Sequence, residues 1–217
     1  MRFESSFYTL PTIELAKALL GQKLCTRVNG VLTSGMIVEV EAYLGADDPA
    51  CHASRGKTAR NEVMFRSPGH CYVYLIYGMH YCINVVSDEV GVGSAVLIRA
   101  VEPLEGIEYM RRRRGTRTDQ LLTSGPGRLC AALGITKTFS GDHYAKSKRV
   151  WLEPYRTVKA DQIGVSTRIG ISKAREHEWR FYFRDSAFVS KFPARKIKRL
   201  SSASLSSRSR RALRADR

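Results

Sequence analysis

Two acidic residues and a tyrosine recur at alternate positions of one short segment, Ile37 to Tyr43. Alternation along a strand would place Glu39, Glu41 and Tyr43 on one face, together with Ile37. The opposite face would carry small apolar residues and is predicted to be the core face: Val38, Val40 and Ala42. An ionised carboxylate can act as a general base toward water, and a neighbouring aromatic ring can stack on a planar group. The segment is therefore a candidate active-site strand.

A second segment, Tyr72 to Met79, crowds three tyrosines into a predicted hairpin. Tyr77 precedes Gly78 at the predicted turn, where a bulky aromatic residue is expected to be exposed. Tyr72 and Tyr81 are interpreted as rings that pack within the sheet, which is the usual role of tyrosine in strands.

The chain around these segments is strongly basic. Its 217 residues include 36 Lys and Arg against 20 Asp and Glu, a formal net charge of +16. Such an excess favours a polyanionic partner (DNA, RNA or an anionic membrane) over a surface that is merely soluble. A carboxylate among aromatic rings in a basic protein suggests an enzyme that takes a base out of a nucleic acid and cleaves its glycosidic bond. The base must leave the duplex because an enzyme cannot reach it inside.

Composition limits the other possibilities. Hydrophobic residues make up 43% of the chain, which predicts one ordered domain with a sizeable core. No apolar run approaches the ~18 residues that span a bilayer, and the start lacks the order of a signal peptide. We therefore expect a cytoplasmic protein, associated with the nucleoid if its source is bacterial. The five cysteines include no CxxC pair and Cys51-His52 stands alone, so we expect no disulfide framework, no metal and no other cofactor.

The elements that would position these residues are strands and short helices. Asn29-Gly30 is a tight-turn signal between strands predicted at Gln22 to Val28 and Val31 to Tyr43. Further strands are predicted at Cys71 to Ile76, Tyr81 to Ser87, Ser94 to Val101, Val150 to Leu152, Thr167 to Ile171 and Arg180 to Phe183. Helices are predicted at Pro11 to Leu20, Pro103 to Arg113 and Gly125 to Gly134. The amide-rich start of the last helix could bind a phosphate.

Two stretches lie outside this regular pattern. Gly45 to Pro68 is long, polar and irregular, and a loop of this length is often functional. From Lys196 onward the chain turns basic and rich in serine. We expect a single domain over residues 1–200, followed by a disordered tail, residues 201–217, that adds non-specific electrostatic attraction.

Longer motifs follow one another in the chain: Val38-Glu-Val-Glu-Ala-Tyr-Leu-Gly45, Asp48, His52-Ala-Ser-Arg-Gly56, Arg60-Asn61, Met64-Phe65, Pro68-Gly-His-Cys-Tyr-Val-Tyr-Leu-Ile-Tyr-Gly-Met-His-Tyr-Cys-Ile-Asn84, Val96-Leu-Ile-Arg-Ala-Val-Glu-Pro-Leu-Glu-Gly106 and Ser124-Gly-Pro-Gly-Arg-Leu-Cys130. Their order and spacing closely resemble the alkyladenine (3-methylpurine) DNA glycosylase family, which removes damaged purines in base excision repair. Weaker similarity continues through residues 167–171 and 179–182. The resemblance covers most of the chain, and motifs this long are highly specific.

The resemblance implies a role for each matched site residue. Glu41 matches the family's general base, which activates the water that attacks C1′ of the deoxyribose, and Arg99 matches a residue that helps to hold this water. Tyr43 and His52 match the residues that cover one face of the flipped base. Tyr74 matches the residue that covers the other face.

Two further matches concern the duplex and the choice of base. Tyr77 matches an aromatic wedge that fills the gap in the duplex, and Asn84 matches a pocket-floor residue that influences which purines fit. The implied fold is α+β: a single mixed domain around a curved, largely antiparallel β-sheet with flanking helices and a protruding tyrosine hairpin. Glu39 is interpreted as structural, since the match places the base two residues later. Ala59 departs from the pattern, because the family often has proline there.

The sequence thus predicts a monofunctional glycosylase for alkylated or deaminated purines of the 3-methyladenine, 7-methylguanine and hypoxanthine type. It would act as a monomer on damaged double-stranded DNA and leave the abasic site uncut. A lyase would need an amine nucleophile, and among the matched site segments only the loop lysine Lys57 offers one. One alternative is a non-catalytic DNA- or RNA-binding module, in which Glu41 would be costly beside phosphates. A second is a hydrolase of free nucleosides, which leaves the charge and Tyr77 unexplained.

Overall fold

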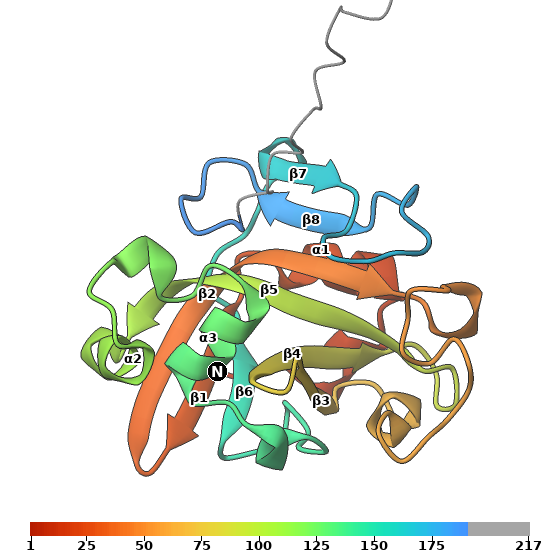
Figure 1. Ribbon diagram of the computed structural model, residues 1–217, viewed down its shortest axis with the longest axis horizontal. Helices are drawn as coiled ribbons and strands as arrows, with labels where there is room; N and C mark the ends of the chain where they lie inside the picture. Colours follow the sequence, from red (N-terminus) through yellow and green to blue (C-terminus); the bar gives the residue numbers. More distant parts are fainter. Residues whose placement is uncertain (191–217) are drawn as a thin grey trace, which may run out of the picture.

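The computed structural model describes residues 1–190, which form one mixed α+β unit around an open antiparallel sheet. Its central strands follow the order β3 (Cys71–Ile76), β4 (His80–Ser87), β5 (Ser94–Glu105), β2 (Val31–Tyr43), β1 (Lys23–Val28) and β6 (Val150–Glu153). Two short strands complete it: β7 (Ile163–Ser166) pairs with β8 (Arg180–Phe183), and β8 pairs with β2. Figure 1 shows β7 and β8 along one side of β2, with β5, β4 and β3 on the other. The predicted fold class is confirmed.

Three α-helices flank the sheet in the described part of the chain: α1 (Thr12–Leu19), α2 (Ile107–Arg114) and α3 (Pro126–Leu133). Leu15 and Leu19 of α1 and Leu129 of α3 pack against β2 and β4 residues in one buried apolar cluster. Burial of apolar side chains is the dominant favourable term in folding, so this cluster stabilises the sheet. The cluster thereby provides a rigid base for the residues at the end of β2.

Most predicted elements agree with the structure to within a few residues, and two do not. The helix predicted from Pro103 begins only at Ile107, because β5 continues to Glu105 and Gly106 makes the turn with a φ of 72°. The strand predicted at Thr167 to Ile171 is wrong, because β7 ends at Ser166 and the following residues form bends. That segment instead enters the site described below.

The alternation predicted along β2 is broken in its middle. Ile37 packs in the main core cluster with Val40, whereas Val38 packs in a separate cluster with Phe183. The pairing of β2 with β5 shifts register on both sides of Glu39, as in a β-bulge. The predicted faces of Ile37 and Val38 are therefore wrong, because an extra residue in the strand reverses the parity of every position before it.

The described residues set the limits within which the remaining predictions can be compared with the structure. The basic tail, residues 201–217, and the last ten residues of the predicted domain lie outside the described residues. Within residues 1–190, no helix has the length and apolar character needed to cross a membrane. The same residues contain no group of three or more His, Cys, Asp or Glu side chains arranged as a metal site.

Candidate active site

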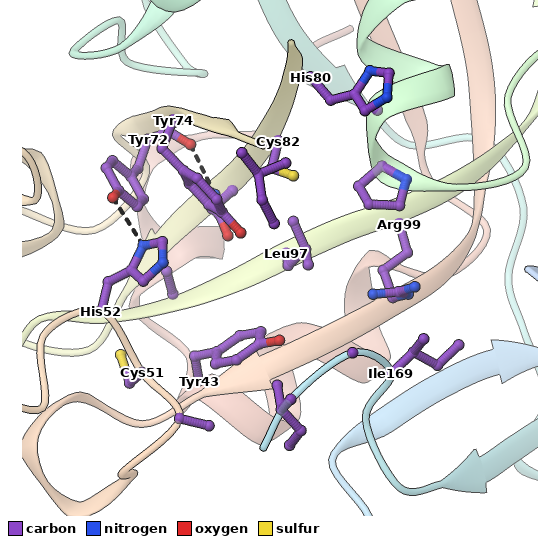
Figure 2. Close-up of a pocket in the computed structure, with 18 of the residues that line it drawn as sticks. Tyr43, Cys51, His52, Tyr72, Tyr74, His80, Cys82, Leu97, Arg99 and Ile169 are labelled. Atoms are coloured by element: carbon purple, nitrogen blue, oxygen red, sulfur yellow. Dashed lines mark hydrogen bonds between the residues drawn. The ribbon is translucent and has the colours of Figure 1, made fainter. Parts of the chain in front are cut away.

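One cavity of about 800 Å³ opens between the end of β2, the β3–β4 hairpin, β5, two loop segments (residues 49–55 and 169–173) and the start of α3 with the two residues before it (residues 124–128). Six of the seven predicted site residues line it: Tyr43, His52, Tyr74, Tyr77, Asn84 and Arg99. Figure 2 shows Tyr43 on one side of the opening, Tyr72 and Tyr74 on another, and Arg99 beside Ile169. The structure therefore brings together residues from four strands, one loop and one hairpin turn in one aromatic-walled cavity.

The seventh predicted residue, Glu41, lies directly behind the wall of this cavity. Its side chain is fully buried, and three donors hold its carboxylate. The Tyr43 hydroxyl donates to Oε2 at 2.8 Å, the Ile169 amide donates to Oε1 at 2.7 Å, and Arg99 Nη1 lies 3.2 Å from Oε1. All three donor residues line the cavity. The carboxylate is therefore fixed in orientation and separated from the cavity by one layer of side chains.

Glu39 is equally buried but faces a different set of partners. Its Oε1 accepts from Arg99 Nε at 3.1 Å and from Arg180 Nε at 2.6 Å, and its Oε2 accepts from the Ser190 amide at 2.7 Å. It is absent from the cavity wall. Arg99 thus bridges the two carboxylates, with Glu39 holding its Nε and Glu41 its Nη1. This geometry supports the structural interpretation of Glu39.

Burial and the charges of Glu41 and Glu39 together keep the two side-chain donors around Glu41, Tyr43 and Arg99, protonated. Burial raises the pKa of Tyr43 well above its ordinary value, and the Glu41 charge raises it further. Burial works to lower the pKa of Arg99, but the Glu41 and Glu39 carboxylates outweigh it and the pKa rises. At neutral pH, Tyr43 is therefore a neutral hydrogen-bond donor and Arg99 a cation.

Three aromatic rings form a contact cluster on the opposite side of the cavity. His52 Nδ1 lies 3.0 Å from the Tyr72 hydroxyl, and the His52 and Tyr74 centroids are 4.4 Å apart in an edge-on contact. A purine stacked between two rings separates them by roughly 7 Å, twice the ordinary contact distance. His52 must therefore shift before it and Tyr74 can contact opposite faces of one base. Burial, with a smaller effect of Arg60, lowers the pKa of His52 from its ordinary value, which favours the neutral ring at pH 7.

The remaining two predicted residues belong to the β3–β4 hairpin: Tyr77 lies in its turn and Asn84 lies in β4. Tyr77 is 80% exposed and has a φ of 53°, a backbone region that bulky residues rarely occupy. Asn84 is buried, and its Nδ2 donates to the Tyr72 carbonyl at 2.9 Å, which fixes the orientation of its amide in the cavity wall. The predicted exposure of Tyr77 is confirmed.

Several residues of the site were not anticipated. Arg168 and Asp48 form a fully buried ion pair beside Tyr43. Asp48 stood within a recognised motif, but the strand expected around Arg168 gave no sign of this contact. Basic residues also line the cavity: Arg55, Arg128 and Lys173, to which the sequence gave no role, and Arg114. Lys173 brings an exposed amine to the cavity, whereas Lys57 does not line it.

Comparisons with known proteins agree with the sequence motifs. The model of the family described as methylpurine-DNA glycosylase (MPG) matches residues 6–187. A relative from Chlorobaculum tepidum, named "Putative 3-methyladenine DNA glycosylase", is 48% identical over 194 residues that cover 88% of this chain and 91% of the relative. Relatives of the same name from Carboxydothermus hydrogenoformans and Bacillus cereus are 44% and 48% identical, each aligned over 88% of this chain and 100% of its own length. The family resemblance is confirmed.

Proposed function

The chain belongs to the methylpurine-DNA glycosylase family, and on this premise we propose that it hydrolyses the N-glycosidic bond of damaged purines in double-stranded DNA. The substrates are alkylated and deaminated purines of the 3-methyladenine, 7-methylguanine and hypoxanthine type, and the product is an uncut abasic site for base excision repair. The observation that carries the proposal is Glu41, a buried carboxylate held by three donors behind the wall of an aromatic cavity. The names of the relatives support methylpurines as substrates.

The cavity requires that the target base leave the duplex. Flipping costs a few kcal/mol in lost pairing and stacking. Tyr77, exposed at the hairpin tip, is the wedge that fills the gap and offsets part of this cost. Tyr43 and Tyr74 then stack on the base, at about 1–3 kcal/mol for each ring. A purine without damage loses more pairing energy on flipping, which gives one source of selectivity.

The chemical step uses one carboxylate. We expect water to reach Glu41 between Arg99 and Ile169, which both bind Oε1. This water gives its proton to the carboxylate and attacks C1′. The electron pair of the broken C–N bond passes to the purine, which leaves. Most enzymes that cleave oxygen-linked sugars need a second carboxyl as acid. An N-alkylated purine already carries positive charge, so it leaves without an acid, and the Glu41 charge also stabilises the oxocarbenium-like transition state.

The basic residues around the cavity provide the attraction to DNA. Arg55, Arg114, Arg128 and Lys173 surround the opening where phosphates of the flanking strand would lie. Such contacts give affinity without sequence preference and weaken as salt rises. One protein bound at one lesion completes this arrangement, so we propose that the enzyme acts as a monomer on cytoplasmic or nucleoid DNA.

The test of this function is base release from a duplex with one hypoxanthine, compared with release from free 2′-deoxyinosine at equal concentration. We expect release from the duplex and alkali-labile sites at the lesion, with little hydrolysis of the nucleoside. Equal rates on the free nucleoside would favour a nucleoside hydrolase. Tight duplex binding without release, from hypoxanthine DNA and from methylated genomic DNA alike, would favour a non-catalytic binding module.

Replacement of the wedge should affect duplex substrates selectively. In Tyr77→Ala, we expect the single-turnover rate on the hypoxanthine duplex to fall roughly 10- to 100-fold, because unstacking of about a few kcal/mol is no longer offset. A single-stranded oligonucleotide with the same lesion needs no wedge, so its rate should change much less. The matched control is Tyr155→Ala, another exposed tyrosine that does not line the cavity. Equal losses on both substrates would contradict the wedge role.

The two classes of lesion should differ in pH dependence. Neutral hypoxanthine needs protonation as it leaves, so its rate should fall more steeply at high pH than the rate for cationic 7-methylguanine. At acid pH, below the lowered pKa of His52, the ring gains a proton. A cationic ring in the cavity disfavours a cationic base, so the 7-methylguanine rate should fall more steeply at acid pH. The rates on the two lesions, measured from pH 5 to 9, test both the alkaline and the acid prediction. Profiles of the same shape for the two lesions would contradict both.

A further inference from the structure

Four planar groups stack in a column that ends at the cavity wall. The His177 and Trp179 rings are nearly parallel, with centroids 4.1 Å apart. The Arg168 guanidinium carbon lies 4.9 Å from the Trp179 centroid and 4.6 Å from the Tyr43 centroid. Tyr43 lines the cavity, whereas Arg168 is 4% exposed and does not. Arg168 therefore covers the face of Tyr43 that is turned away from the cavity.

A buried ion pair locks this guanidinium in place. Arg168 and Asp48 side chains are both fully buried, and Nη2 donates to Asp48 Oδ1 at 2.9 Å while Nη1 contacts Oδ2. Two parallel bonds of this kind fix the plane of the group as well as its position. The Ala50 amide donates to Asp48 at 3.0 Å and holds the carboxylate in turn. Arg168 Nε is buried with no acceptor among residues 1–190, so the contacts of Nη1 and Nη2 and the two rings set the orientation of the guanidinium.

The column also holds the backbone that carries Glu41. Ala42 separates Glu41 from Tyr43, and both of its backbone groups bond to the column. Its carbonyl accepts from Arg168 Nη1 at 3.0 Å, and its amide donates to the Trp179 carbonyl at 2.9 Å. The Ile169 amide, next to Arg168 in the chain, donates to Glu41 Oε1. Movement of the guanidinium would therefore disturb two of the three donors to Glu41.

We propose that Arg168 is a positioning residue of the glycosylase reaction, acting through Tyr43 and Ile169 on the orientation of Glu41. The inference rests on the proposed function and adds to it a residue outside the cavity. A flipped purine stacked on Tyr43 would form the next layer of the column. Arg168 would therefore also fix the position of the base along the column, relative to the Glu41 carboxylate. Tyr43 thus has one face supported by a cation and one face free for the substrate.

The test is Arg168→Lys, which keeps a cation opposite Asp48 but removes the planar layer and the paired bonds. We expect the maximal single-turnover rate of base release to fall roughly 10- to 100-fold, as for a displacement of about 1 Å at a catalytic group. Affinity for an undamaged duplex should change less than about twofold, because Arg168 does not reach the surface where phosphates bind. The matched control is Arg113→Lys, a partly buried arginine that bonds the Ala132 carbonyl and is absent from the cavity wall.

A second pair of variants covers the case in which Arg168→Lys fails to fold. Trp179→Leu removes the outer layer while keeping an apolar side chain, and the rate should fall roughly 2- to 10-fold, as for loss of a cation–π contact. Trp179→Phe keeps a ring in the column and should restore most of that loss. If Arg168 and Trp179 served folding alone, the variants would shift the unfolding midpoint, and the rate of base release would not fall while affinity for undamaged duplex stayed nearly unchanged.

The outcomes separate the inference from the function on which it rests. Normal release by the wild-type enzyme with an unchanged rate in Arg168→Lys, or in Trp179→Leu if the first does not fold, overturns the inference alone. Parallel losses of rate and of affinity for undamaged DNA also overturn it, since they indicate a general effect on binding. No release by the wild-type enzyme overturns the proposed function, and the inference with it.

Discussion

Replacement of Glu41 by glutamine is expected to abolish base release while leaving duplex binding intact. A positioned general base typically contributes 10²- to 10⁴-fold, and the single-turnover rate should fall by roughly that factor. Glutamine keeps the shape of the side chain and one acceptor for the Ile169 amide. The Tyr43 hydroxyl can rotate to accept from the new amide, so the buried site stays satisfied. The protein should therefore fold and keep its cavity.

Duplex affinity is the internal check on this variant. Loss of a negative charge near the DNA should leave affinity for a lesion duplex unchanged or slightly higher. The matched control is Glu62→Gln, which removes an exposed carboxylate paired with Arg66 and worth little energetically. It should release base at the wild-type rate. A Glu41→Gln enzyme that retains more than about a tenth of the wild-type rate would show that another group activates the water.

Replacement of the neighbouring Glu39 by glutamine should instead destabilise the fold. Its carboxylate is buried between Arg99 and Arg180, and a neutral amide would remove the negative charge that both guanidinium groups contact. Breaking a buried ion pair from one side costs about 3–5 kcal/mol. That is a large part of the roughly 5–15 kcal/mol that stabilises a typical domain. Urea unfolding followed by circular dichroism measures the loss.

The comparison variant for Glu39 is Glu105→Gln. Glu105 also pairs with a cation, Lys23, but half of its side chain is exposed, so its loss should cost less than about 1 kcal/mol. Folded Glu39→Gln should release base far faster than Glu41→Gln at saturating enzyme. A stability loss for Glu39→Gln no larger than that of Glu105→Gln would refute the structural role assigned to this carboxylate.

The local features of this site could be predicted from the sequence because they depend on neighbours in the chain. Strand alternation put Glu41 and Tyr43 on one face, and Gly78 marked the turn that exposes Tyr77. The bulge around Glu39 escaped prediction, because a one-residue insertion in β2 is defined by its pairing with β5 and leaves no mark in composition. For that reason, the predicted strand face was right for Glu41, which follows the bulge, and wrong for Ile37, which precedes it.

The contacts that hold Glu41 lay beyond the reach of sequence patterns. The Ile169 amide that binds it is 128 residues away in the chain, and Arg168 is 120 residues from its partner Asp48. No periodicity connects positions so far apart, and the segment around Arg168 was predicted as a strand. The family resemblance predicted which groups would touch the substrate. It gave no role to Arg168, Trp179 or His177, which stack behind Tyr43.

The most direct test of the account is the identity of both products formed by the wild-type enzyme from a duplex with a single hypoxanthine. Chromatography with mass detection would quantify free base, and denaturing gels would show strand breaks before and after alkali. The account predicts free hypoxanthine in equal amount to alkali-labile sites, with the strand intact until alkali is added. Strand cleavage without alkali, together with a protein–DNA adduct trapped by borohydride, would identify an amine nucleophile such as Lys173. That result would contradict the attack of water activated by Glu41.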